Sequence, residues 1–274
     1  MTLIEAVGDG AVVNGGLDDD SLFSILGKDV TLNGGGGSDH IVFQSNGSED
    51  SDLGFVQGGS GDDTIDAFGK DSVIDGDAGN DIISVQGALL SASGGAGDDT
   101  ISCESADFRA ETLLYGNAGN DFLILENSTG YQIGAITDGG AGDDRIETNT
   151  YLNSANSSDS LTGGDGEDQF ELIFNGVEFD SEVPDRGVVT TITGFVPSED
   201  VLVMPLDIQS SNGSGDVPIT FQIVQAEDGT YTDVIFSAVD PAATATEIAI
   251  TTTATITLFG HQQFDECRCC SGRS

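Results

Sequence analysis

Aspartates that end a short glycine-rich pattern are the residues of this sequence best suited to chemistry. The pattern is G-G-x-G-x-D, and all seven copies end in aspartate. Tight glycine turns point backbone carbonyl oxygens inward, and each aspartate adds a carboxylate. Ca²⁺ takes about six to eight such oxygen ligands, more than one turn supplies, so we expect it to bind between stacked turns. The copies begin at Gly34, Gly58, Gly76, Gly94, Gly116, Gly139 and Gly163.

Each turn must be held by a short strand, because a large apolar residue follows every aspartate at the second position. One apolar residue flanked by variable residues predicts a half-buried strand in which the apolar side chain points inward. A turn and one strand are too small to bury this apolar face alone, so the copies must stack around a shared core, as in a solenoid. The apolar residues are Ile41, Ile65, Ile83, Ile101, Leu123, Ile146 and Phe170.

The spacing of the copies predicts one complete coil per copy. The first glycines are separated by 24, 18, 18, 22, 23 and 24 residues, and 18 is two nine-residue units. One turn of each coil therefore carries the pattern, and a plain half-coil supplies the second strand. We expect those second strands at Asp71–Asp75, Leu89–Ser93 and Glu111–Tyr115.

Three copies depart from the pattern. Asp77 and Asn117 replace the second glycine, and both residue types tolerate the left-handed conformation expected at the first, second and fourth positions. A damaged eighth copy, Gly15–Asp20 followed by Leu22, lies 19 residues before Gly34. It remains in register with the others.

The repeats resemble those of the repeats-in-toxin (RTX, hemolysin-type) calcium-binding family over residues 15–174. The resemblance implies an all-β, right-handed parallel β-roll of about eight coils, with about six Ca²⁺ ions between stacked turns and a seventh if Asp20 contributes. It implies side-chain ligands at Asp39, Asp63, Asp81, Asp99, Asp121, Asp144 and Asp168. It places further metal-site residues at Gly35, Gly37, Gly59, Gly61, Gly79, Gly95, Gly97, Gly119, Gly140, Gly142, Gly164 and Gly166.

The last third of the chain changes character and predicts a β-rich cap. The run Ile192–Leu202 resembles the I-x-x-F-x-x-x-x-D-x-L segment that closes many domains of this family. Runs of β-branched residues predict strands at Val188–Phe195, Val201–Met204, Ile219–Val224, Tyr231–Phe236, Glu247–Thr251 and Ala254–Phe259. We therefore expect a roll over 1–174, a cap and export region over 175–260, and a disordered tail over 261–274.

The charge of the chain limits its partners. With 48 acidic and 7 basic residues its formal net charge is −41, which opposes compaction and binding to nucleic acid or anionic membranes. Bound Ca²⁺ would offset this repulsion. No stretch approaches the length of a membrane span, and Met1–Ala6 lacks the basic and apolar regions of a signal peptide. The resemblance nevertheless implies secretion by type I machinery, with extracellular matrix or surface polysaccharide as further partners.

Signs of catalysis are missing from the sequence. His40 has no H-E-x-x-H companion and should point outward, and no G-x-S-x-G elbow is present. We therefore expect a structural calcium-binding protein rather than an enzyme, with a non-catalytic module of a larger secreted enzyme, toxin or adhesin as the alternative. An ice-binding role is disfavoured because the third positions carry no rank of threonines. Cys103 stands alone, and His261 with Cys267, Cys269 and Cys270 offers a zinc alternative to a disordered tail.

Overall fold

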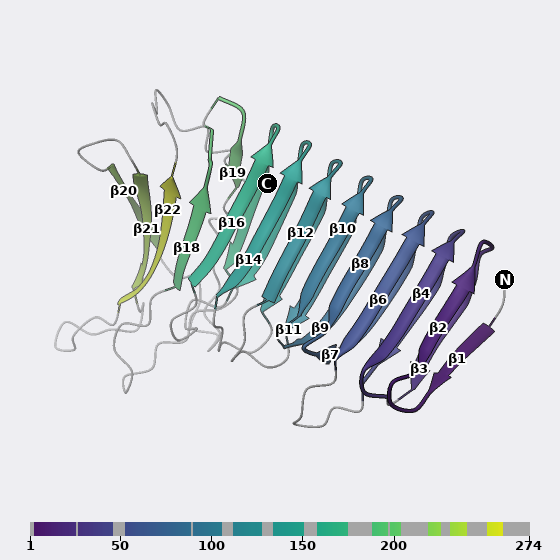
Figure 1. Cartoon of the computed structure of the whole chain (residues 1–274). Coiled ribbons are helices and arrows are strands. Elements are labelled where there is room, and N and C mark those ends of the chain that lie inside the picture. Colours follow the sequence, from purple (N-terminus) through teal and green to yellow (C-terminus); the bar gives the residue numbers. More distant parts are fainter. Residues whose placement is uncertain are drawn as a thin grey trace, which may run out of the picture.

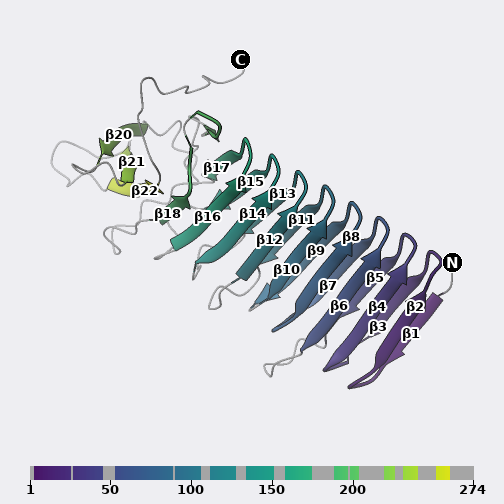
Figure 2. The same ribbon diagram turned by 45° about the horizontal axis from the view of Figure 1, so that its top comes forward.

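The computed structural model shows a long roll of short strands (Figure 1). Its described residues are 3–25, 27–45, 53–88, 90–105, 112–127, 134–150, 158–174, 188–196, 198–203, 219–225, 231–239 and 251–259. Two parallel sheets face each other along the roll, as the turned view in Figure 2 shows. None of these residues forms a helix of the length and apolar character needed to cross a membrane.

Within the described residues, 10 strands form one sheet and 12 the other. The first sheet contains β1 (Leu3–Val7), β3 (Ser21–Ile25), β5 (His40–Gln44), β7 (Thr64–Lys70), β9 (Ile82–Ala88), β11 (Thr100–Ser105), β13 (Phe122–Asn127), β15 (Arg145–Thr150), β17 (Gln169–Phe174) and β19 (Val201–Val203). The second contains β2 (Val12–Gly16), β4 (Val30–Gly36), β6 (Gly54–Ser60), β8 (Val73–Ala78), β10 (Ser91–Ala96), β12 (Thr112–Ala118), β14 (Ala135–Ala141), β16 (Ser158–Asp165), β18 (Val188–Thr193), β22 (Thr251–Phe259), β21 (Tyr231–Val239) and β20 (Ile219–Gln225).

Each coil runs along the second sheet, turns through the glycine pattern and returns along the first sheet. Equivalent residues of successive copies pair in parallel, as Gly35 with Gly59 and Ile65 with Ile83. The expected parallel β-solenoid is therefore confirmed. The coil count differs slightly from the expected eight. β1 and β2 stack before the first complete copy, and β18 and β19 stack after the last.

The core is a stack of apolar columns between the two sheets. Ile65 and Ile83, which follow the pattern aspartates, are at most 1 % exposed, and Leu32 and Val56 face them from the second sheet. Phe43 fills the space beside Gly54 and Gly69, where an added Cβ would collide with its ring. Contiguous burial along the roll explains why a single unit could not fold alone.

The pattern residues extend the second-sheet strands further than expected. β8, β10 and β12 begin at Val73, Ser91 and Thr112 and continue through the third residue of the pattern. The strands expected over Asp71–Asp75, Leu89–Ser93 and Glu111–Tyr115 therefore exist with shifted bounds. The first three pattern residues belong to the strand, and the turn itself is confined to the fourth to sixth positions.

The C-terminal strands continue the second sheet. β22 pairs in parallel with β18, and β21 joins β22 and β20 in antiparallel fashion, which confirms the expected β-rich cap. The expected strand at Glu247–Thr251 lies outside the described residues except for Thr251. The domain boundaries remain predictions, as does the tail, which lies outside the described residues.

Candidate metal site

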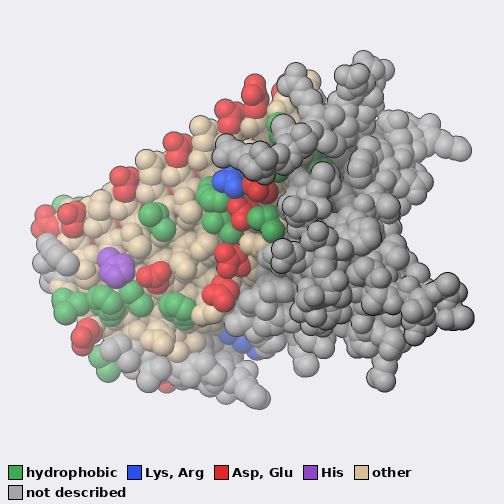
Figure 3. All heavy atoms as spheres, turned by 180° about the vertical axis from the view of Figure 1, so that it is seen from behind, with side chains coloured by type: hydrophobic (Ala, Val, Ile, Leu, Met, Phe, Trp, Pro, Cys, Tyr) green, Lys and Arg blue, Asp and Glu red, His purple; other side chains and the backbone are tan. Residues whose placement is uncertain are grey.

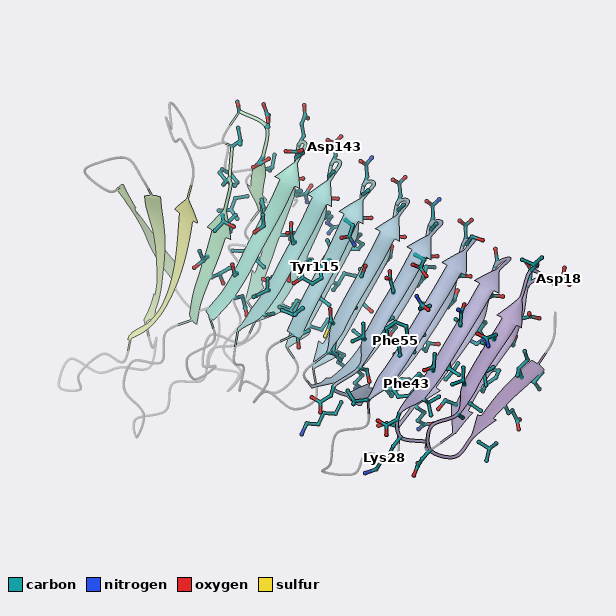
Figure 4. The ribbon with its side chains drawn as sticks, viewed as in Figure 1. Asp18, Lys28, Phe43, Phe55, Tyr115 and Asp143 are labelled. Carbon is teal, nitrogen blue, oxygen red and sulfur yellow. The ribbon has the colours of Figure 1, made fainter. Side chains whose placement is uncertain are left out.

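The patterned turns form one edge of the roll, here called the repeat edge. They lie in a single row in Figure 4, from the turn of Asp18 to the turn of Asp143, while Lys28 lies at the opposite edge. The second and fourth glycines named above all have φ between 103° and 138°, a range that favours glycine. Asp77 and Asn117 adopt φ of 69° and 78° at the second position, so both altered turns keep the expected shape.

The first glycine of the pattern has a different role from the one expected. It does not adopt positive φ. A Cβ at Gly34 would instead collide with Oδ2 of Asp39 in its own turn and with the carbonyl oxygen of Gly58 in the next coil. The clash with Oδ2 recurs in every following copy, and the clash with the next carbonyl oxygen recurs in most of them, as at Gly76. This position therefore requires glycine to make room for oxygen atoms.

The pattern aspartates form a continuous ladder inside the repeat edge. The backbone N–H of each aspartate donates to Oδ1 of the aspartate in the next coil, over N–O distances of 2.7–3.1 Å. We call this chain of residues the aspartate ladder: Asp20, Asp39, Asp63, Asp81, Asp99, Asp121, Asp144, Asp168 and Asp200. It fixes one carboxylate oxygen of every rung after Asp20.

A second ladder runs in the opposite direction on the outside of the turns. At the fifth position, the N–H of Asn80 donates to Oδ1 of Asp62 in the preceding coil, and the N–H of Asp98 donates to Oδ1 of Asn80. The series continues through Asn120, Asp143 and Glu167 with N–O distances of 2.8–2.9 Å. Each turn is thus bonded to both neighbours through side chains, which holds its carboxylate in a fixed position.

The other carboxylate oxygen of the ladder, Oδ2, is buried without a hydrogen-bond partner among the described residues. This holds for all seven pattern aspartates, Asp39 to Asp168, whose exposures are only 1–3 %. A buried carboxylate oxygen without a partner is costly unless a cation or a proton satisfies it. At five of the seven turns the carbonyl oxygen of the next coil's first glycine lies near the same space, and such oxygen atoms suit Ca²⁺.

Electrostatics point the same way. Burial raises the pKa of Asp81 and Asp144 to about 7 and that of Asp63 and Asp99 to about 6. The amide hydrogen bond to each opposes this shift, and neighbouring carboxylates add to it. Without a cation these carboxyl groups therefore hold their protons to higher pH than exposed aspartates do, and a cation placed there would displace the protons.

Three or more metal-binding side chains do not gather at one point anywhere in the described residues. The ladder explains this, since every coil contributes one inward carboxylate. A cation in this row must therefore take much of its coordination from backbone carbonyls, as the glycine-rich turns allow.

The structure brings all nineteen predicted metal-site residues to the repeat edge, although their role as ligands remains a prediction. Sequence reasoning missed two features. One is the first-position glycine as a space for Oδ2, which only the side-chain geometry reveals. The other is Asp200, which continues the ladder without a glycine pattern; the signal was its Asp-x-Leu spacing to Leu202, which matches the Asp-x-apolar spacing of the repeats.

One more carboxylate lies inside the roll, away from the ladder. Asp159 on β16 is 1 % exposed, and its Oδ1 accepts a hydrogen bond of 3.1 Å from the N–H of Ala135. Its Oδ2 has no partner among the described residues. Burial raises its pKa to about 6, against the lowering effect of the Ala135 bond.

The remaining candidates lie apart from the ladder. His40 is exposed as expected, but it contacts the ring of Phe23 edge-on and lies 3.6 Å from Asp66. Cys103 is a free, fully buried core residue whose pKa is raised to about 12 by burial. His261 and the three C-terminal cysteines lie outside the described residues, so the zinc alternative stays a prediction.

The outer face of the first sheet carries scattered hydrophobic side chains and a row of acidic side chains along one edge (Figure 3). Its main basic group is Arg145, which lies over the ring of Phe122 and pairs with Glu147 at 3.1 Å and Glu171 at 2.6 Å. These contacts link three successive strands. Arg145 therefore links neighbouring coils through its ion pairs and its contact with Phe122, and its guanidinium group is not free to bind a ligand.

Comparison with known families identifies the repeats. The model of the RTX calcium-binding nonapeptide repeat matches in four copies, at residues 57–85, 91–102 and 113–127. Repeats of this kind form a structural calcium-binding fold. A comparison with curated proteins gave no match, and neither did a comparison with solved structures.

Proposed function

We propose that this chain, which carries the repeats of the RTX calcium-binding family, folds on binding a row of Ca²⁺ ions and serves as a secreted structural module. The observation that carries this proposal is the row of seven buried Oδ2 atoms at the repeat edge, none of which has a hydrogen-bond partner among the residues that the structure describes. Bound Ca²⁺ would supply positive charge and link neighbouring coils. The aspartates hold it by Oδ2 while their Oδ1 atoms keep the ladder.

The proposed ions lie in the gaps between successive turns. Seven turns leave six gaps, so about six ions are expected, with a seventh if the Asp20 turn contributes. The second and fourth glycines give the turns the shape that brings carbonyl oxygens towards the next coil, as with Gly35 and Gly59. The first glycine leaves space beside each Oδ2.

Charge supports the dependence of folding on calcium. At a net charge of −41 the chain repels itself, and its ladder concentrates carboxylates in one line. Each ion adds two positive charges where this repulsion is greatest. Binding and folding are therefore coupled, because the gaps exist only when coils are stacked.

Circular dichroism tests the proposal directly. In EGTA the far-UV spectrum should be that of a largely disordered chain, and about 10 mM Ca²⁺, well above the affinity of extracellular modules, should produce a β spectrum. Mg²⁺ at the same concentration is the matched control, because it binds few all-protein sites. Identical spectra in EGTA and Ca²⁺ would contradict folding on calcium.

Secretion and a matrix or surface role complete the proposal. They are supported by the acidic composition and by the proposed calcium binding, since extracellular modules bind Ca²⁺ with dissociation constants of about 10⁻⁴–10⁻³ M. Type I secretion machinery and surface polysaccharide are the partners implied. Fractionation of producing cells should place the protein in the medium, and retention inside the cells would contradict this.

A further inference from the structure

The aspartate ladder ends at a rung that differs from all others. Asp200 accepts the N–H of Asp168 on Oδ1 at 3.1 Å, and Val201 donates to the carbonyl oxygen of Asp168 at 2.7 Å. These are the bonds that join every pair of successive pattern aspartates. β19 also pairs Leu202 with Phe170, which places Leu202 where the repeats have their inward apolar residue. Asp200 is therefore a rung in register.

Its second oxygen is already satisfied. Oδ2 of Asp200 accepts the N–H of Val196 at 2.7 Å, whereas Oδ2 of Asp168 and of the six preceding pattern aspartates has no partner among the described residues. A protein amide thus occupies the position in which the other rungs need a cation.

The backbone of Asp200 also stops the ladder. Its N–H donates to the carbonyl oxygen of Val196 at 2.8 Å, within its own turn, as does that of Glu199 at 2.9 Å. In every other rung the aspartate N–H reaches the next coil. Phe195, only 5 % exposed, packs its ring 6.0 Å from that of Phe170 and closes the core at the same level.

We propose that Asp200 is a calcium-independent terminal rung, which positions Asp168 and sets the C-terminal limit of the ion row. The gap between Asp168 and Asp200 holds no ion, because Oδ2 of Asp200 is bonded to Val196 and the turn lacks the repeated glycines. Oδ2 of Asp168 therefore serves the last ion of the row, in the gap between Asp144 and Asp168. The C-terminal limit of the ion row rests on the proposed calcium binding, whereas the hydrogen bonds of Asp200 are independent of that proposal.

Amide exchange tests the rung itself. In Asp200→Ala, the amides of Asp168 and Val196 should exchange about tenfold faster or more, the factor expected for one hydrogen bond to a charged acceptor. Asp200→Asn can accept only one of the two bonds, so only one amide should lose protection. Glu199→Ala, an exposed neighbour in the same turn, is the control and should change neither. Unchanged protection in Asp200→Ala would overturn the proposal, even if the protein bound no calcium.

Metal analysis at saturating Ca²⁺ tests the limit of the row. Asp200→Ala should retain the wild-type number of ions while needing several-fold more Ca²⁺ to fold, because Asp168 is no longer held. Asp168→Ala should lose one ion or more. Loss of an ion in Asp200→Ala would make Asp200 a ligand and overturn the limit. Absence of calcium from the wild type would instead refute the proposed function. The hydrogen bonds of Asp200 would then be tested by amide exchange alone.

Discussion

Replacing Asp159 by asparagine should make the folded protein more stable than the wild type by an amount that increases with pH. The pKa of Asp159 is about 6 when folded and about 3.8 when unfolded, so the folded state holds its proton more tightly. The stability that this proton provides is complete below pH 3.8 and is lost as pH rises through 6. From these two values the ionisable group costs about 2 kcal/mol near pH 5 and about 3 kcal/mol near pH 7.5. Asparagine keeps the acceptor for Ala135 and carries no titrating group.

Chemical denaturation of wild type and variant in saturating Ca²⁺ measures this difference. The stability gained by Asp159→Asn should be greater near pH 7.5 than near pH 5 by about 1 kcal/mol, because any cost of burying the amide is the same at both pH values and cancels. Comparing two pH values for one pair of proteins cancels the titration of the ladder, which both share. A gain independent of pH would show that Asp159 is solvated or paired, and would refute the burial argument.

The other predictions concern the ladder. Asp99→Ala should raise the Ca²⁺ concentration needed for folding and reduce cooperativity more than Asp39→Ala, because Asp99 lies in the middle of the row; His40→Ala should have little effect, since its pair with Asp66 is exposed and contributes about 0–1 kcal/mol. Calcium titrations by circular dichroism rank the three, and a larger effect at His40 would overturn the register. The pH dependence should reverse with calcium. Because burial raises the pKa of Asp63, Asp81, Asp99 and Asp144, any compact calcium-free state should lose stability as pH rises from about 3.8 through 6–7, whereas the calcium-bound state should gain stability because ligands must be deprotonated. Thermal melts in EGTA and in Ca²⁺ across this range check both signs, and parallel trends would contradict the reasoning.

The fold could be predicted because the same constraint recurs in every coil. Ile65 and Ile83 mark the core, and the glycines mark the turn, so seven copies specify one register. Exceptions were harder to anticipate. Asp200 joins the ladder through a turn that is bonded to Val196, and the glycine pattern of the repeats does not precede it.

The role of the first glycine and the burial of Asp159 were hidden for a related reason. Both depend on where a side chain points in three dimensions. Gly34 has ordinary φ, and its need for glycine becomes visible only when Oδ2 of Asp39 is placed beside it. Asp159 lies in the plain half-coil, where the sequence does not repeat and the inward position is therefore not marked. The number of ions and the ligand set remain predictions.

Because successive coils stack in the same register, the roll could be lengthened or shortened by whole coils. Residues 76–93 form an 18-residue period, and its strands pair in the same register with the coils on both sides. An in-frame duplication of that segment would lengthen the roll by about 4.8 Å, the spacing of adjacent strands, without creating a new kind of contact. The gene can therefore grow or shorten by whole coils, while the closing turn at Asp200 stays the same.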